Sequence, residues 1–293
     1  MFISHIVGGL GNQMFVYAMA KSLASVKSAE LKLDLSTFNH KKYINPEGYL
    51  LSKVFGVDEK EAGFCDYFNA LGIKAAIFPL VKRRMISADK DVFLFEKEVF
   101  KFDDEYEKNE KLRKGYILGY WQTEKYFLKT EKEIRKRFEF NKSQISTRAI
   151  ELADKIMQKN SVSVHIRRGD YISNPVYSKS YDFCGMDYYN AAFKTINSKV
   201  ESPFYCIFTD DIEWTASQEI FKNALICSES GEGSWNDMYL MSVCKHHIIA
   251  NSTFSWWGAW LNPNKNKIVV SPNSWFIDGR VAHDLIPKNW VTV

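Results

Sequence analysis

The stretch VSVHIRRGDY, residues 162–171, begins as an apolar run rich in β-branched residues and ends in charged side chains. An apolar run of this length bounded by polar residues predicts a buried strand. His165 lies near its end, and Arg167, Arg168 and Asp170 follow it. An arginine offers a planar fork of donors that matches two oxygens of one phosphate. The stretch therefore predicts a strand whose carboxyl end binds an anion; a surface salt bridge between arginine and aspartate is the alternative.

Similar apolar runs follow at FYCIF, ALIC, HIIA and KIVV, and segments of helical character separate them. This alternation predicts an α/β fold with a parallel, doubly wound sheet. Ligands of such sheets bind beyond the carboxyl ends of the strands. Polar groups follow two of the other predicted strands, at residues 209–211 and 251–254. We therefore expect these groups to lie at the same edge of the sheet as Arg167.

The residues after these two strands have more than one possible role. Asp210 and Asp211 end the run FTDD at a predicted strand-to-helix junction, where one carboxylate is expected to cap the helix. The other can accept from two donors of a guanine base, or the pair can bind Mg²⁺. Ser252 and Thr253 begin a tryptophan-rich helix, whose backbone donors either bind an anion or form an ordinary cap.

The N-terminal sequence FISHIVGGLGNQM predicts a strand, a glycine turn and a helix that begins near Met14. Gly9 and Gly11 partly match a dinucleotide-binding fingerprint, but Met14 occupies the place of its third small residue. This difference argues against an NAD-dependent oxidoreductase. Either the glycines let a ligand approach the backbone, with Asn12 as a donor beside it, or they only make a sharp turn.

The composition fits a two-domain protein. The chain has 293 residues, of which 46% are hydrophobic, and we predict domains at residues 1–150 and 151–293. The 39 basic and 35 acidic residues give a net charge of +4, which is too small to indicate nucleic-acid binding.

Other sequence features predict a cytoplasmic protein. The five cysteines form no CxxC pair, which argues against a disulfide framework and a zinc site. The N-terminus does not match a signal peptide, and no apolar run approaches the length of about 18 residues that a membrane span needs. Residues 124–140 predict a helix with Phe127, Ile134 and Phe138 on one side. We expect its charged face to be solvated; contact with a membrane surface is the alternative.

Taken together, the motifs GGLGNQMF, HIRRGDY, FTDD and NSTFSWWGAWLN resemble those of the α-1,2-fucosyltransferases of glycosyltransferase family 11. The resemblance extends from about residue 6 to the closing PKNWVTV, although residues 38–115 contribute little to it. It implies a GT-B type of fold, in which two Rossmann-like domains face each other across a cleft. The N-terminal domain would lie on the acceptor side, and the C-terminal domain would bind GDP-fucose.

The resemblance also implies the reaction. An inverting enzyme would transfer L-fucose from GDP-β-L-fucose to the 2-hydroxyl of a terminal β-galactoside, in a free or lipid-linked glycan such as an O-antigen unit. No metal and no cofactor besides this donor would be required. No nucleic acid is expected as a partner, and contact with the inner face of the membrane would be peripheral at most.

The resemblance further implies roles for the residues singled out above. Arg167 would grip the diphosphate, Asn12 would reach the reaction centre, and Asp170 would either act as general base or orient the arginines. An arginine can stabilise the charge that develops on the departing GDP without a metal. His165 would lie by the ribose or base, and Asp210 would bind guanine. The whole donor-binding set comprises His165, Arg168, Asp210, Asn251, Ser252, Thr253, Phe254, Gly9 and Gly11.

Two other functions remain open from the sequence. A related transferase would form an α-1,3 or α-1,6 linkage. A protein of a different class would bind nucleotide sugars or glycans without turning them over.

Overall fold

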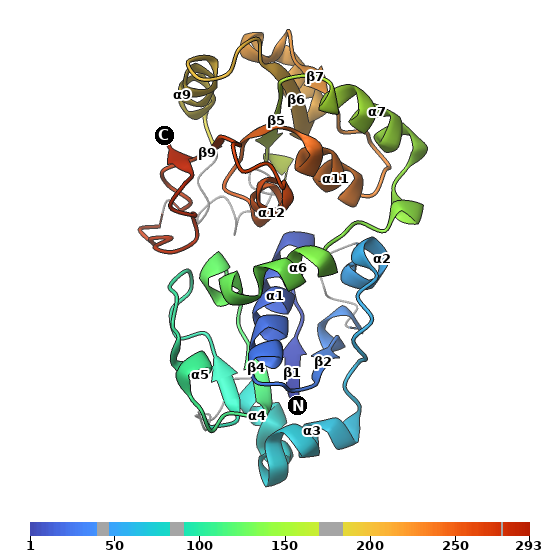
Figure 1. The fold of residues 1–293 in the computed structure, drawn as a ribbon, viewed down its shortest axis with the longest axis vertical. Helices are drawn as coiled ribbons and strands as arrows, with labels where there is room; N and C mark the ends of the chain where they lie inside the picture. Colours follow the sequence, from blue (N-terminus) through green and yellow to red (C-terminus); the bar gives the residue numbers. More distant parts are fainter. Residues whose placement is uncertain (40–46, 83–90, 170–183, 277) are drawn as a thin grey trace. The chain divides into compact units, whose positions relative to one another are not determined.

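The computed structural model describes residues 1–39, 47–82, 91–169, 184–276 and 278–293 (Figure 1). The chain divides into two compact units. The first comprises Met1–Glu139 and His283–Leu285, and the second comprises Phe140–Ala282 and Ile286–Val293.

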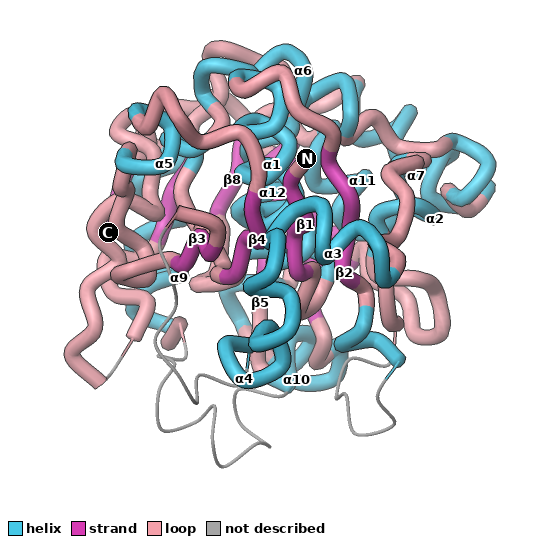
Figure 2. Tube along the Cα trace, turned by 90° about the horizontal axis from the view of Figure 1, so that it is seen from below, coloured by secondary structure: helices cyan, strands magenta, loops and turns pink. Residues whose placement is uncertain are grey.

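The first unit is built on a four-stranded parallel sheet in the order β2-β1-β4-β3. Figure 2 shows these strands side by side. Their bounds are Phe2–His5 for β1, Leu31–Asp34 for β2, Phe93–Phe95 for β3 and Gly115–Leu118 for β4. The predicted strands at the N-terminus are thus confirmed. Because the numerical order of the strands reverses at β1, the crevice between β1 and β4 is the expected ligand position of this sheet.

The long helix α1 (Leu10–Val26) is buried on almost all sides. A helix that is apolar around its whole circumference lies inside a core. The Phe15 ring lies 6.3 Å from the Phe127 ring, and the Tyr17 ring lies 5.7 Å from the Phe138 ring. The remaining helices of this unit are short: α2 (Leu51–Phe55), α3 (Phe64–Leu71), α4 (Phe78–Lys82), α5 (Glu105–Lys108) and α6 (Glu131–Arg137). Its 3-10 turns are η1 (Ser36–Asn39), η2 (Gly72–Ile77), η3 (Glu124–Tyr126) and η4 (Leu128–Thr130).

Two sequence expectations about helices are corrected. The first helix begins at Leu10 rather than near Met14, because Gly8 alone makes the turn at φ +82° and Gly9 is already the N-cap. The predicted helix over residues 124–140 is instead η3, η4 and α6 in succession. Its three apolar side chains are nevertheless buried as expected, at Phe127, Ile134 and Phe138.

The second unit contains a six-stranded parallel sheet in the order β10-β9-β8-β5-β6-β7. The strands are β5 (Ser161–Ile166), β6 (Phe204–Thr209), β7 (Leu225–Ile226), β8 (His246–Ile248), β9 (Val269–Ser271) and β10 (Val291–Thr292). The helices among its described residues are α7 (Thr147–Met157), α9 (Met186–Asn197), α10 (Ile212–Ser217), α11 (Trp235–Val243) and α12 (Thr253–Leu261), with η5 (Lys142–Gln144) and η6 (Glu219–Phe221).

Helices cover both faces of this sheet, so the predicted doubly wound arrangement is confirmed. Residues of α9 pack with Val162 and Val164 on one face. Residues of α7 and α11 pack with Cys206 and Phe208 on the other. Figure 1 shows α9 on one side of these strands and α7 with α11 on the other. None of the helices in the described ranges could cross a membrane.

A buried polar chain ties three elements of the second unit together. His247 on β8 lies 2.8 Å from the Ser163 hydroxyl on β5 and 2.7 Å from the Asn262 amide that ends α12. Because Asn262 Nδ2 donates to Nε2 of the ring, Nδ1 carries the proton and faces Ser163. His247 is therefore a structural histidine. Trp256, Trp257 and Trp260 on α12 are likewise core residues that pack against one another.

Candidate functional site

The three polar groups expected to share an edge lie at the carboxyl ends of adjacent strands. Strand β5 lies between β8 and β6, and the numerical order of the strands reverses at β5. The His165 ring on β5 lies 5.8 Å from the Phe254 ring at the start of α12. Arg167 Nη1, after β5, lies 2.9 Å from Asp210 Oδ2, after β6. The second unit therefore has a candidate binding edge at the position where doubly wound sheets hold ligands.

Asp210 fixes the backbone and the side chain of the arginine pair at once. One oxygen pairs with Arg167, and the other accepts from the Arg168 backbone N–H at 2.8 Å. A Cβ atom at position 169 would lie 3.0 Å from Asp210 Oδ2, so Gly169 allows the carboxylate to lie close to the backbone. The side chain of Arg167 is about one-third exposed. It thus presents a positive charge at the edge while a carboxylate holds its direction.

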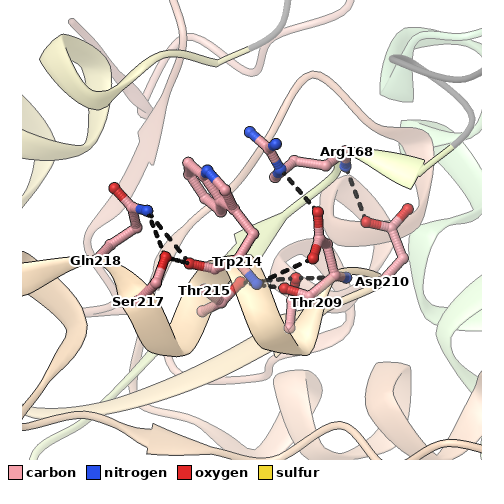
Figure 3. A network of polar contacts seen from close by, with 8 residues as sticks. Arg168, Thr209, Asp210, Trp214, Thr215, Ser217 and Gln218 are labelled. Atoms are coloured by element: carbon pink, nitrogen blue, oxygen red, sulfur yellow. Dashed lines mark hydrogen bonds and ion pairs between the residues drawn. The ribbon is translucent and has the colours of Figure 1, made fainter.

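Arg168 takes a different direction from Arg167. Its Nε donates to Asp211 at 3.0 Å, and its guanidinium stacks on Trp214 at 3.7 Å from the ring centre. Figure 3 shows Arg168 with Trp214 and with Asp210, which its backbone N–H contacts. Asp211 also caps α10 through Trp214 N–H, which confirms that one carboxylate of the pair is a helix cap. The hydrogen bond from Arg168 lowers the pKa of Asp211.

His165 is buried under this edge. Burial, together with the nearby Arg167 charge, lowers the pKa of His165 to about 3. Its Nδ1 has no hydrogen-bond partner within the part of the chain that the structure describes. The ring is therefore neutral at physiological pH and can serve as a hydrogen-bonding group, not as a cation.

The turn between β8 and α12 forms the other side of the edge. Ser252 caps α12, because its hydroxyl accepts from Phe254 N–H at 3.3 Å. Thr253 is the first residue of the helix. Asn251 is almost fully buried and donates to the Trp275 carbonyl at 3.1 Å, so its side chain holds the turn in place. The start of α12 thus points helix donors at the same edge as Arg167.

The glycine turn of the first unit places Asn12 at the crevice between β1 and β4. Gly9 is the N-cap of α1, whereas Gly11 and Asn12 lie in its first turn. Gln122, which follows β4, donates to Asn12 Oδ1 at 2.8 Å. A Cβ at Gly8 would lie 2.6 Å from Asn12 Cβ. Gly8 and Gln122 thus confine Asn12, and the sequence pattern indicates a role for neither residue.

Replacing Gly8 with alanine is expected to displace Asn12 and to destabilise the first unit by about 1 to 3 kcal/mol, because position 8 has a positive φ and no space for a methyl group. Gly9→Ala is the matched control, since a methyl group at position 9 would have no atom within 4 Å and the φ there is −69°. Urea unfolding of both variants measures the difference. Equal stability of the two variants would contradict the close packing of Gly8 against Asn12.

Asp237 is a further carboxyl group for which the sequence pattern indicates no functional role. Ser228 donates to it at 2.5 Å and accepts from Thr209 N–H, so Asp237 lies close to the end of β6. Burial raises the pKa of Asp237 to about 6. Its only signal in the sequence is a position in the helix after ALIC, which is indistinguishable from an ordinary first-turn acid.

Other expectations concern Asp170 and metals. Asp170 lies outside the described residues. Among the residues that are described, no cluster of histidine, cysteine, aspartate and glutamate side chains could hold a metal ion. All five cysteines are free thiols, and only Cys65 is exposed.

Comparisons with known proteins find relatives over nearly the whole chain. The family model described as Glycosyl transferase family 11 matches residues 2–293. An alpha-1,2-colitosyltransferase of Escherichia coli is 34% identical over 305 residues, which cover 99% of this chain and 98% of the relative. The O-antigen biosynthesis glycosyltransferase WbnK of Escherichia coli is 32% identical over 314 residues, which cover 99% of both chains.

Among solved structures, fucosyltransferase NodZ from Bradyrhizobium has a TM-score of 0.52 at 15% identity and covers 88% of this chain and 91% of that chain. The NodZ alpha-1,6-fucosyltransferase co-crystallized with GDP has a TM-score of 0.53 at 16% identity, with 88% and 90% covered. At this level of identity the likeness concerns the fold. It confirms the predicted α/β architecture of the GT-B type.

Proposed function

The chain belongs to glycosyltransferase family 11, and we propose that it transfers L-fucose from GDP-β-L-fucose to the 2-hydroxyl of a terminal β-galactoside with inversion. The observation that carries this proposal is the position of Arg167 at the reversal point of the six-stranded sheet, held there by Asp210. Cleavage of the bond between sugar and phosphate leaves negative charge on the nucleotide. A cation that is already oriented stabilises that charge without reorganisation.

The donor would lie along the edge formed by the ends of β8, β5 and β6. The start of α12 with Ser252 and Thr253 supplies backbone and hydroxyl donors to the diphosphate beside Arg167. The neutral His165 ring lies under the same edge. NodZ, which shares the fold, was co-crystallized with GDP, which supports a guanine nucleotide as the leaving group here.

Recognition of guanine needs a carboxylate, and the contacts of Asp210 and Asp211 limit which carboxylate is available. Both oxygens of Asp210 already accept from the arginine pair, and Asp211 is committed to Arg168 and to the helix cap. Asp210 would have to bind guanine with the lone pairs that these contacts leave free. Asp237, near the end of β6, is therefore the alternative candidate to Asp210 for the two guanine donors.

A second donor sugar, colitose, is favoured by one specific observation. The colitosyltransferase is 34% identical over almost the whole chain. Colitose is L-fucose without its 3-hydroxyl, so a site built to hydrogen-bond that hydroxyl would reject the colitose donor strongly, whereas an apolar site would not reject it. The name of the relative WbnK supports an O-antigen unit as the acceptor.

The test offers the purified chain GDP-fucose or GDP-colitose, each with a β-galactoside such as lactose, and measures GDP release and the linkage of the product. An α-1,2-linked fucose on galactose is the expected product. Transfer of colitose without transfer of fucose would make GDP-colitose, and not GDP-fucose, the donor. An α-1,3 or α-1,6 product would overturn the linkage, and nucleotide binding without turnover would show a binding protein.

Chelation is expected to leave the rate within about twofold of its original value, because Arg167 and the start of α12 supply the positive potential that a divalent ion supplies in other transferases. Initial rates with excess EDTA, and after addition of Mg²⁺ or Mn²⁺, measure this. A loss of more than about tenfold that Mg²⁺ restores would contradict the proposal of a metal-independent site.

A further inference from the structure

A contact between two side-chain amides spans the crevice of the four-stranded sheet. Gln122 Nε2 donates to Asn12 Oδ1 at 2.8 Å. Asn12 follows β1 and Gln122 follows β4, and the strand order reverses between these strands. We propose that Gln122 is a positioning residue for sugar transfer, which fixes the side-chain amide of Asn12. The inference rests on the proposed function and on the role at the reaction centre that the family resemblance implies for Asn12.

The segment that carries Gln122 is held in a strained conformation. Trp121 has a φ of +55°, which is uncommon for a large residue. Such a conformation costs on the order of 1 to 3 kcal/mol and persists only where the surroundings enforce it. Trp121 is buried and packs edge-on against Tyr106 and Tyr126. The strain thus lies directly before the residue that contacts Asn12.

Glu96, after β3, enforces this conformation. Its carboxylate accepts from the backbone N–H groups of Tyr120 at 2.8 Å and Trp121 at 3.0 Å. A side chain at Gly119 would lie 2.6 Å from Glu96 Cβ, so the glycine permits the contact. Burial raises the pKa of Glu96, against the effect of these hydrogen bonds. A mostly buried carboxylate is thus used to fix the backbone on which Gln122 lies.

Asn12 is confined from the opposite side by Gly8. A methyl group at Gly8 would lie 2.7 Å from Asn12 Nδ2, so the amide packs against the turn. Because Gln122 donates to Oδ1, it selects the orientation in which the Nδ2 end of the amide lies away from Gln122. While Gln122 keeps its orientation, an Asn12 amide turned by 180° would place two donors against each other. With Gln122 Nε2 as the donor, the Nδ2 end of Asn12 is therefore the end that can donate at the crevice.

The decisive experiment is a double-mutant cycle with Asn12→Ala, Gln122→Ala and the double variant, with kcat, the KM for the donor and urea unfolding measured for each. If Gln122 acts through Asn12, Gln122→Ala lowers kcat by about 10-fold and Asn12→Ala by about 100-fold, with KM changed by less than about threefold. The double variant then has the kcat of Asn12→Ala alone. A merely structural role would not produce this loss of additivity.

Isosteric variants provide a matched comparison. Gln122→Glu replaces the donor to Asn12 by a carboxylate, and we expect it to lower kcat at least as much as Gln122→Ala. Gln158→Glu adds the same charge at the exposed end of α7 and is expected to leave kcat unchanged.

Independent effects that multiply in the double variant would overturn the inference, and so would a kcat of Asn12→Ala equal to that of the active wild-type chain. Both results would leave the proposed transferase function intact. A wild-type chain that transfers neither sugar would instead overturn the proposed function, and the role of Gln122 with it.

Discussion

Replacement of Arg167 by alanine is expected to lower kcat by about 100- to 1,000-fold, the largest effect of any single substitution in the second unit. Removal of one oriented donor to a developing anion typically raises the barrier by about 3 to 4 kcal/mol. Arg167 is held in place by Asp210 and stays charged at any working pH. The loss should appear in kcat more than in KM, because the charge on the nucleotide grows as the bond breaks.

Two variants separate charge from geometry at this position. Arg167→Lys keeps the charge but loses the planar fork, and we expect it to recover only part of the rate. Asp210→Asn weakens the partner that orients Arg167 and should lower kcat by about 10-fold. Initial rates at saturating donor, with unfolding curves to establish that each variant is folded, measure these effects. A folded Arg167→Ala variant with a wild-type kcat would remove Arg167 from the mechanism.

The second unit could be predicted closely from the sequence because its signals are local. Each buried strand is a continuous apolar run, and the polar group at its carboxyl end follows within a few positions. The cap of α10 by Asp211 also follows from adjacent residues. The sequence could not predict which carboxylates form ion pairs with the two arginines. Arg167 pairs with Asp210 and Arg168 pairs with Asp211, and both aspartates follow the neighbouring strand. No local sequence pattern distinguishes these partners from Asp170.

The first unit was harder to predict because its determinants lie far apart along the chain. Asn12 and Gln122 are 110 positions apart, and only the order β2-β1-β4-β3 brings them together. The start of α1 was misplaced because GGLGNQ has the composition of a turn. In the structure, burial of Leu10 within the core extends the helix through Gly11, against the low helix propensity of glycine.

The helix predicted over residues 124–140 illustrates a related limit. Its periodic apolar residues correctly identified the buried side. Periodicity cannot detect that Thr123 caps a 3-10 turn or that Phe127 ends it with φ −133°, outside the helical region. The roles of the donor-binding residues and of Asn12 stay predictions, and the experiments above test them.

The free energy of unfolding is expected to fall steeply as the pH decreases from 7 to 5, because three buried histidines are neutral in the folded protein. Burial lowers the pKa of His165 to about 3 and that of His5 to about 4, and it lowers the pKa of His247 far below 6.5. Each folded pKa lies below the unfolded value, so the unfolded chain binds protons first. Stability is therefore present above pH 6.5 and is lost progressively below it.

The size of the effect follows from the unfolded chain. At pH 5 a free histidine with a pKa of 6.5 has gained about 2 kcal/mol by protonation, so three histidines account for about 6 kcal/mol. This approaches the whole stability of many domains. Asp237 acts in the opposite direction, because its pKa of about 6 in the folded protein exceeds 3.8, and it offsets about 1 to 2 kcal/mol at pH 5. Carboxylates with lowered pKa values, such as Asp211, contribute only below about pH 4.

Urea unfolding at pH 8, 7, 6 and 5 tests this, with a decrease of about 3 to 5 kcal/mol expected between pH 7 and pH 5. His247→Gln isolates one contribution: it removes the proton uptake of one site, so the slope of stability against pH should decrease by about one-third while the variant is less stable at pH 8. His283→Gln is the control, since this variant removes an exposed histidine instead of a buried one. A stability that is constant from pH 8 to pH 5 would mean that these rings are not buried in neutral form. The His165 ring could then carry charge beside the nucleotide, and Arg167 would no longer be sufficient to explain the positive potential at this edge.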